Sequence, residues 1–396
     1  MTREERELRR QERARRRQIE IAAKEAARGP LDVPFLLLTL LLTGVGLIML
    51  FSASFPMAYY EGVGPAHYLI RQGLFAAVGL VVMMAIGRIN YERYRVAGKY
   101  VLAVAIFLLI LVLVPGVGIT RNNATRWLGF GELFTFQPSE IAKIGVILYF
   151  SDSISKKKEK MRTVKYGLAP YLIILGIIGA LMIKEPHLSG TVLILGIGAV
   201  MMFVGGIHPV AAAFGVAAAV GAAWVYLSGV FGYNYKRITI WRDPLTNDPD
   251  LMRDAGYQIR QSLLAIGSGG LLGVGLGKSR QKFMYLPERH NDFIFAIICE
   301  ELGLIGATLI MALFALLIIR GYWIALHARD RFGALMAVGV TTQVALQVFL
   351  YIAVVTNLIP NTGISLPFFS YGGTALVIQL AEMGLVLSVS RQMPVS

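Results

Sequence analysis

The chain has 396 residues, of which 56% are hydrophobic and only 16% are charged, with a mean hydropathy of +0.62. This composition excludes a soluble globular protein. The formal net charge is +14. The single cysteine, Cys299, excludes an internal disulfide and lies in an apolar run, where a small buried hydrophobic residue is expected.

Apolar runs long enough to cross about 30 Å of hydrocarbon recur along the whole chain. Each must be helical, because lipid offers no partner to backbone polar groups. We therefore expect an all-α integral membrane protein, a polytopic bundle of about ten transmembrane helices. The expected spans are residues 34–55, 68–88, 100–118, 139–152, 168–184, 190–207, 209–230, 291–319, 333–356 and 374–389.

The positive charge lies mostly in a tail at residues 1–33, helical or disordered, and in short segments at 93–99, 156–160 and 320–331. With the tail in the cytoplasm, an even number of spans places these segments and a short C-terminus, residues 391–396, on the cytoplasmic side. The charge thus indicates topology, with some attraction to anionic membrane lipid. We expect no nucleic-acid partner.

The segment at 120–139, expected on the outer face, carries Arg126 beside Trp127. Such a pair is typical of the aromatic belt at a membrane surface, but it also suits a lipid pyrophosphate, whose oxygens a guanidinium grips. Lys184, at the end of its span, serves the same purpose or extends to the interface.

The motif QPSEIAK at 137–143 follows directly. Pro138 suits the first turn of a helix, and Glu140 and Lys143 are spaced to share one helix face. Charged side chains inside a span are costly, so we expect these two to pair and to face the protein interior. A structural ion pair and a substrate contact both fit this pattern.

The long segment at 231–290, expected outside between the seventh and eighth spans, holds four aspartates within residues 243–254. Carboxylates in such a loop have three alternative roles. They are solvated surface residues by default, but they can also hold a hard divalent cation such as Mg²⁺ or, when desolvated, act as a general base. Their spacing does not match an EF-hand. The glycine-rich run at 267–277 does not match the spacing of a phosphate-binding loop. We therefore favour a role in close packing of helices over phosphate binding.

Five strings in order, QPSEIAK after TRWL, GYQIRQSLLAIGSGG, GVGLGKSRQK, LPERHNDFIFAIICEELG and PNTGISLPFFSYGGT, resemble the SEDS family of shape, elongation, division and sporulation proteins. The resemblance covers residues 35–390, which we take as one transmembrane domain at 34–390. The sequence around LPERHNDF resembles the FtsW branch of the family more than the RodA branch.

The resemblance implies ten transmembrane helices and a peptidoglycan glycosyltransferase that polymerises lipid II on the outer face of the bacterial cytoplasmic membrane. It also implies a class B penicillin-binding transpeptidase and other divisome membrane proteins as partners. The family's key acidic residue corresponds to Asp248, the expected general base, with Asp254 as the alternative. Asp248 is also a candidate ligand for a divalent cation, Mg²⁺ or Mn²⁺. The expected substrate-binding residues are Arg126, Trp127, Gln137, Ser139, Glu140, Lys143, Lys184, Glu288, His290, Asp292 and Ser370.

One departure is His187, where many members carry aspartate, so no acidic role is expected there. With a single base, direct displacement at the anomeric carbon inverts its configuration. Two other classes stay open: a flippase for the same lipid-linked precursor, and a non-catalytic divisome scaffold.

Overall fold

The structure is a computed structural model that describes residues 29–121, 124–130, 134–211, 213, 215, 217, 235–246, 248, 251 and 255–393. Most of the basic tail, most of the expected span at 209–230 and the alternative base Asp254 lie outside the described residues.

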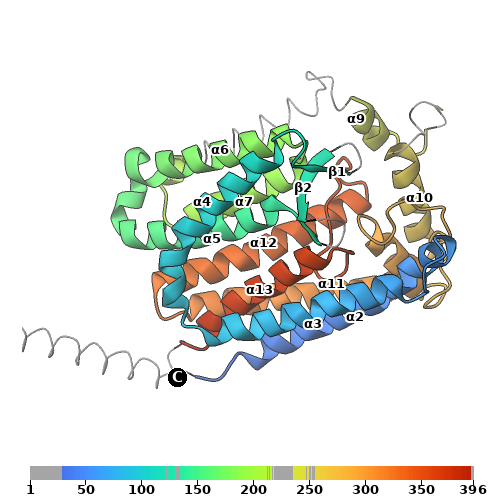
Figure 1. Cartoon of the computed structure of the whole chain (residues 1–396), viewed down its shortest axis with the longest axis horizontal. Helices are drawn as coiled ribbons and strands as arrows, with labels where there is room; N and C mark the ends of the chain where they lie inside the picture. Colours follow the sequence, from blue (N-terminus) through green and yellow to red (C-terminus); the bar gives the residue numbers. More distant parts are fainter. Residues whose placement is uncertain are drawn as a thin grey trace, which may run out of the picture.

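Long helices dominate the described part of the chain (Figure 1). They are α2 (Val33–Tyr60), α3 (His67–Arg88), α4 (Tyr94–Val112), α5 (Pro138–Lys157), α6 (Ala169–Lys184), α7 (Leu188–Val204), α11 (Ile294–Leu326), α12 (Arg331–Val355) and α13 (Gly373–Ser390). Among the described residues, seven helical segments are long and apolar enough to cross a membrane; α7 is shorter, and α5 is charged at both ends. The protein is therefore a multi-pass membrane protein, and nine of the expected spans coincide with these helices.

The third span is displaced from its expected position at 100–118. Helix α4 begins at Tyr94, after a 3-10 turn at Tyr91–Arg93, and ends at Val112. Pro115 cannot continue a helix, and Gly116 adopts a φ of 84°, so the chain leaves the helix early. The apolar residues beyond Val112 therefore form a turn.

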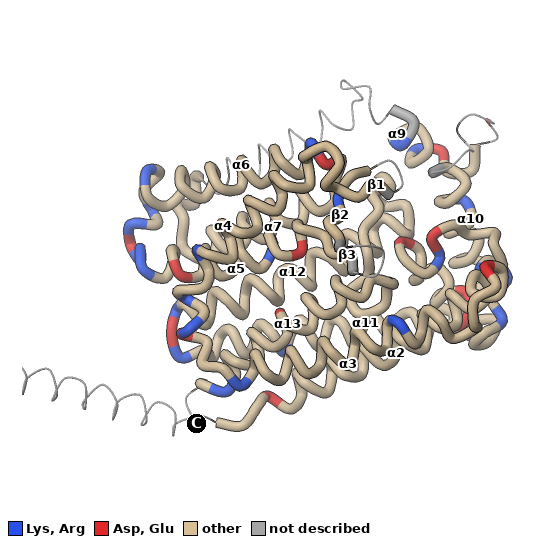
Figure 2. Tube along the Cα trace, in the orientation of Figure 1, with Lys and Arg blue, Asp and Glu red and all other residues tan. Residues whose placement is uncertain are grey.

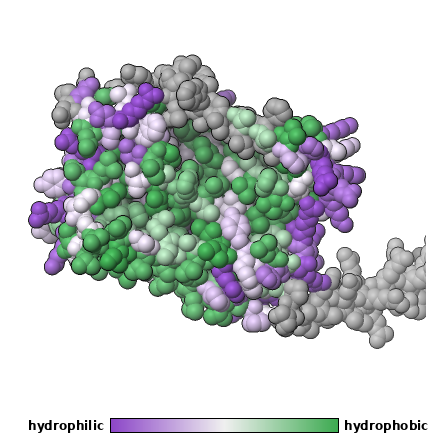
Figure 3. Space-filling view, turned by 180° about the vertical axis from the view of Figure 1, so that it is seen from behind, coloured by the Kyte–Doolittle hydropathy of each residue, from purple (hydrophilic) through white to green (hydrophobic). Residues whose placement is uncertain are grey.

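Helices α12 and α13 form the centre of the bundle. In their most apolar windows 72% and 67% of the residues are buried, against 22–39% in the other candidate spans. The outer helices expose apolar side chains, and Figure 3 shows a broad hydrophobic area between two hydrophilic ends. This is the surface expected of a protein whose sides face hydrocarbon.

Small residues allow the helices to approach closely. A Cβ on Gly145 of α5 would lie 2.9 Å from Leu102 Cα of α4, and one on Gly384 of α13 would lie 2.6 Å from the Met83 carbonyl oxygen of α3. Without a hydrophobic driving force between helices in lipid, such close contact supplies the packing energy.

The two ends of the bundle differ in charge and in structure. Lysines and arginines gather where α5 joins α6 through Lys158–Arg162 and Val164–Leu168, and where α3 joins α4 (Figure 2). We call this the basic end. The other end, the site end, carries a three-stranded antiparallel sheet, β1 (Ile119–Arg121), β2 (Ala124–Phe130) and β3 (Phe134–Phe136), which is too small to change the all-α class. It also carries α9 (Tyr235–Arg242) and α10 (Ala255–Ser268), two helices inside the expected loop at 231–290.

The glycine-rich run packs directly against a break in α11. Gly303 has a φ of 67° inside the helix. The backbone nitrogen of Val274 donates to the Glu300 carbonyl oxygen, and that of Gly275 to the Glu301 carbonyl oxygen, both at 3.0 Å. A Cβ on Gly273 would lie 2.2 Å from the Glu301 carbonyl oxygen. The expected packing role of these glycines is thus confirmed.

Gly273→Ala tests this contact. Because φ is 79° and the new Cβ meets backbone, we expect the substitution to lower the free energy of unfolding by about 1–3 kcal/mol. Thermal unfolding in detergent measures it. Gly267→Ala is the control, since its Cβ meets nothing within 4 Å in α10. Equal stability of both variants would contradict the packing role.

Candidate functional site

Turns from distant parts of the sequence meet at the site end. Arg126 of β2 donates from Nε to the Glu185 carbonyl oxygen at 3.1 Å and from Nη2 to the Pro186 carbonyl oxygen. Gln137 immediately precedes α5, and its Nε2 lies 3.2 Å from His187 Nδ1. Two of the expected substrate-binding residues, Arg126 and Gln137, therefore share the turn between α6 and α7.

Asp292 lies against the same group of turns. It precedes α11, it is partly buried, and a Cβ on Gly363 would lie 3.3 Å from its Oδ2. Gly363 in turn accepts a hydrogen bond at its carbonyl oxygen from Ser189 Oγ at 3.1 Å. The segment before α11, the start of α7 and the segment before α13 thus meet at Asp292.

The environment of Asp292 favours its protonated form. Its pKa is raised to about 7, chiefly by burial and then by the neighbouring Glu288 carboxylate, while Arg126 acts in the opposite direction. Glu288 is held in place by Asn291, whose Nδ2 donates to its Oε2 at 2.8 Å. A carboxyl with a pKa near neutrality is suited to accept a proton at physiological pH.

His290 and Ser370 fasten the segment at 286–293 to the one before α13. The His290 carbonyl oxygen accepts from the Tyr371 backbone at 2.9 Å, and the Ser370 Oγ donates to the Asn291 carbonyl oxygen at 2.7 Å. The buried imidazole packs against Tyr68, with 5.4 Å between ring centroids. Burial is the main cause that lowers the pKa of His290, so the ring is neutral, as suits a positioning role.

The ion pair expected in α5 is present. Lys143 Nζ lies 2.8 Å from Glu140 Oε2, and the lysine is almost fully buried. Behind it, the fully buried Glu382 of α13 accepts a hydrogen bond from Gln343 Nε2 of α12 and interacts electrostatically with Lys143. The neighbouring Ser139 is also buried. This polar column lies inside the bundle, where charged groups need such partners.

The remaining expected residues lie elsewhere in the site end. Trp127 is partly buried in β2, opposite Ile119, and Lys184 is exposed at the end of α6. Asp248 is exposed, and its backbone nitrogen donates to Thr246 Oγ1 at 3.3 Å. Nearby, α9 contacts the segment before α13, where Arg237 Nη1 donates to the Asn361 carbonyl oxygen at 3.1 Å. Within the described ranges no three His, Cys, Asp or Glu side chains are placed to hold a metal ion, and the divalent cation stays a prediction.

The sequence analysis missed five buried acids: Asp32, Glu185, Glu300, Glu301 and Glu382. The signal was available, because acidic residues within or beside apolar runs are rarely retained without a role. Glu185 is the least compensated of them. Both its carboxylate oxygens are buried without a hydrogen-bond partner in the described part of the chain.

Curated relatives resemble the chain over nearly its full length. Stage V sporulation protein E of Bacillus subtilis is 42% identical over 370 residues, which cover 91% of this chain and 97% of the relative. The probable peptidoglycan glycosyltransferase FtsW of Geobacter metallireducens is 38% identical over 362 residues, covering 91% and 95%.

Solved structures share the fold. A chain from a structure reported as structural coordination of polymerization and crosslinking by a peptidoglycan synthase complex aligns with a TM-score of 0.75 and 26% identity, covering 91% of this chain and 98% of the other. The rod shape determining protein RodA of Thermus thermophilus aligns with a TM-score of 0.66 and 26% identity, covering 93% and 99%.

The bundle of long apolar helices with polar turns at its ends defines a multi-pass membrane protein. A family model for FtsW, RodA and SpoVE, described as cell cycle protein, matches residues 33–394. The chain belongs to this family, which is the SEDS family expected from the motifs.

Glu185→Gln tests the uncompensated carboxyl. Burial raises the pKa of Glu185 to about 8 from its ordinary 4.5, with Arg126 opposing the shift, so the folded state favours the neutral acid. The wild type must therefore lose stability as pH rises from 4.5 to about 8. We expect the variant to melt several degrees higher than wild type (roughly 3–6 °C) at pH 9, and within about 1 °C of it at pH 5.

Differential scanning fluorimetry in detergent measures this difference. Glu159→Gln, at an exposed position in the basic end, is the control and should show no such dependence on pH. A Glu185→Gln variant that is less stable at pH 9 than wild type would contradict the interpretation of an uncompensated carboxyl.

Proposed function

We propose that this protein is a peptidoglycan glycosyltransferase that polymerises lipid II into glycan strands. The names of the curated relatives and the likeness to a peptidoglycan synthase complex support this activity. The observation that carries it is that the cationic Arg126 and the carboxyls Asp248 and Asp292 lie at the same end of the bundle. A base and a cation are the two groups that this transfer needs.

In the proposed reaction a sugar hydroxyl attacks the anomeric carbon of a lipid-pyrophosphate sugar. Asp248 accepts the hydroxyl proton while the new carbon–oxygen bond forms and the bond to pyrophosphate breaks. The departing lipid pyrophosphate takes the electron pair, and Arg126 stabilises its charge. One displacement with one base inverts the anomeric centre.

Asp248 is the proposed base, because it stands at the position of the family's key acidic residue, in the segment between α9 and α10. Asp292 is a second candidate, because it is partly buried, and burial together with the Glu288 carboxylate raises its pKa to about 7 while Arg126 opposes the shift. Asp254 stays as a further alternative, and Asp248 is also a candidate ligand for a divalent cation.

The orientation and the partner belong to the same proposal. The lysines and arginines at the basic end support a cytoplasmic position for that end, and hence an extracytoplasmic position for the site end. The likeness to a synthase complex that coordinates polymerization and crosslinking supports a class B penicillin-binding transpeptidase as partner.

Substitution of each aspartate separates the candidate bases. Purified protein, alone and with its partner transpeptidase, is given lipid II, and the products are sized on a gel. We expect Asp248→Asn to lower polymer formation at least about 100-fold and Asp292→Asn to lower it by less than about 10-fold. The reverse order would assign the base to Asp292.

The same preparation tests the other two classes. Wild type that forms no polymer under any partner condition, but moves a fluorescent lipid II across liposomes, would instead be a flippase. Wild type that does neither would be a scaffold.

The pH dependence of kcat/KM gives an independent test. A base must be deprotonated in the free enzyme, so Asp292 as the base would make kcat/KM fall about tenfold per pH unit below its pKa of about 7. A steady-state series from pH 5.5 to 8.5 with lipid II measures it. A flat profile across this range would exclude Asp292 as the base.

A further inference from the structure

Two polar contacts between α2 and α11 mark the depth of the hydrocarbon along these helices. Near the basic end, Arg320 of α11 binds Asp32, the residue that caps α2, at 2.7 Å. Near the site end, Ser52 of α2 donates to Glu301 of α11 at 2.7 Å. Twenty residues separate the two contacts along α2, a rise of about 30 Å, which matches the thickness of the hydrocarbon. Glu301 therefore lies at the hydrocarbon boundary on the side of the site end.

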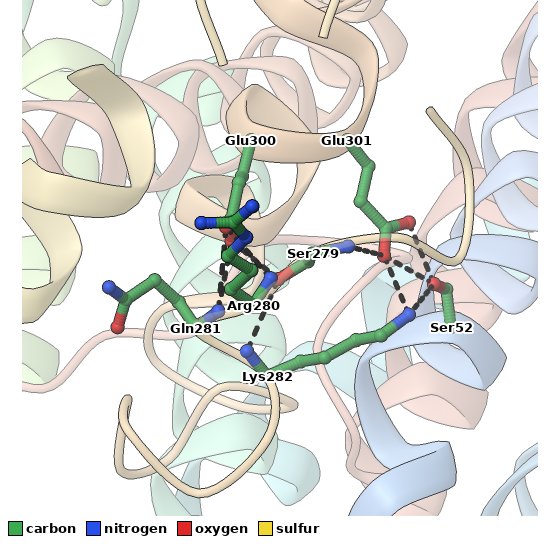
Figure 4. A network of polar contacts seen from close by, with 7 residues as sticks. All are labelled: Ser52, Ser279, Arg280, Gln281, Lys282, Glu300 and Glu301. Carbon is green, nitrogen blue, oxygen red and sulfur yellow. Dashed lines mark hydrogen bonds and ion pairs between the residues drawn. The ribbon is translucent and has the colours of Figure 1, made fainter. Parts of the chain in front are cut away.

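A network of buried polar contacts occupies this boundary (Figure 4). Lys282 Nζ lies 2.8 Å from Glu301 Oε1 and donates to Ser52 Oγ at 3.1 Å. The Glu300 carboxylate accepts from the backbone nitrogen of Arg280 at 2.9 Å. Charged groups at such a depth require partners of this kind. The network therefore fixes the chain that follows the glycine-rich run against α2 and α11.

The glycine-rich run itself lies on the bilayer side of this network. The backbone nitrogen atoms of Leu304 and Ile305, which follow the break in α11, donate to the carbonyl oxygens of Gly270 and Leu271 at 2.9 Å and 3.2 Å, respectively. Both donors come after Glu301 in α11, and the helix continues from there toward the basic end. The start of the run is therefore held at a greater membrane depth than the polar network.

Much of the backbone of the run is bonded within the protein. The backbone nitrogen of Gly273 donates to the Gly269 carbonyl oxygen at 2.8 Å, and those of Val274 and Gly275 donate to carbonyl oxygens of α11 at 3.0 Å. Irregular backbone at membrane depth requires such internal partners, because lipid supplies none. The backbone of the run thus meets the condition for contact with hydrocarbon.

The side chains of the run point outward instead. Leu271 and Leu272 are 67% and 79% exposed, and Leu276 is also exposed. They continue the apolar face of α11, whose Leu304 and Ile305 are exposed beside them. A loop that bonds its backbone internally and exposes leucines next to a lipid-facing helix is suited to the bilayer and not to water.

Basic side chains follow these leucines. Lys278 and Arg280 are both exposed, and the backbone of Arg280 is bonded to the network at the hydrocarbon boundary. No acidic residue occurs in the sequence between Asp254 and Glu288. Apolar side chains at acyl depth beside basic side chains at phosphate depth are typical of interfacial anchors that bind anionic lipid.

We propose that residues 270–280 form a membrane-inserted loop. It places Leu271 and Leu272 in the acyl region of the leaflet at the site end, and Lys278 and Arg280 against the phosphates of anionic phospholipids in that leaflet. The loop fixes the height of the site end relative to the lipid headgroups. This inference goes beyond the proposed glycosyltransferase activity and does not depend on it.

A fluorescent label measures the depth of the loop. The full chain, without a partner protein, is placed in nanodiscs of phosphatidylcholine and phosphatidylglycerol, with or without a nitroxide near the start of the acyl chains. An NBD group is attached at Leu272→Cys in a Cys299→Ala background. We expect the nitroxide to lower its fluorescence at least about twofold, since a side chain of an interfacial anchor lies about 5–10 Å into the headgroup and acyl boundary.

Two further positions calibrate this depth. Leu309→Cys, at an exposed site on α11, should be quenched by the nitroxide as Leu272→Cys is. Gly64→Cys, in the turn between α2 and α3 where a Cβ meets nothing within 4 Å, should be quenched little. A label at Leu272→Cys that behaves like the one at Gly64→Cys would overturn the proposal. If the proposed transpeptidase partner then shielded that label from water, the surface would be a protein interface instead.

A second comparison tests the basic residues. At equal mole fraction, nitroxide on phosphatidylglycerol should quench the Leu272→Cys label at least about threefold more than nitroxide on phosphatidylcholine, because nearby lysine and arginine enrich anionic lipid. Lys278→Gln combined with Arg280→Gln should bring this ratio close to one. Lys184→Gln, at an exposed position at the end of α6, is the control and should leave it unchanged. An unchanged ratio in the double variant would overturn the assignment of Lys278 and Arg280 to phosphate contact.

Discussion

The constraint on which this structure depends is that hydrocarbon supplies no hydrogen-bond partners. Backbone groups in the spans must be satisfied within each helix, and irregular chain is confined to the two ends. The sheet, the short helices α9 and α10 and the turn at Glu185 are all at one of them. A polar site can therefore be assembled from turns that are distant in sequence, because the bundle brings every second turn to the same surface.

The few charges that enter the bundle follow the same constraint. Lys143 is buried with Glu140, and Lys282 with Glu301, in each case at 2.8 Å. Such pairs contribute less to net stability than to uniqueness of packing, because an alternative arrangement would leave a charge without a partner. In this fold the first pair fixes α5 near the centre of the bundle and the second fixes the chain that leads to Asp292.

The sequence allowed good prediction of the spans and of the pair Glu140–Lys143, since both depend on local periodicity. It also indicated correctly that Arg126 and Gln137 belong to one polar surface. It did not indicate Asp292 as a second candidate base, because the burial of this residue depends on the meeting of the segments before α11 and α13. Glu300 and Glu301 escaped notice for a similar reason, as their donors lie on a loop about 20 residues away.

The break at Gly303 gives the first part of α11 a direction of its own. Nine residues separate it from the start of the helix at Ile294, a lever of about 14 Å at 1.5 Å per residue. A change of only about 10° at the break would displace that end by roughly 2 Å, which exceeds the tolerance of a reacting geometry. The backbone angle at Gly303 thus sets the position of the whole site. A partner that binds α11 near this glycine would control the reaction by changing that angle.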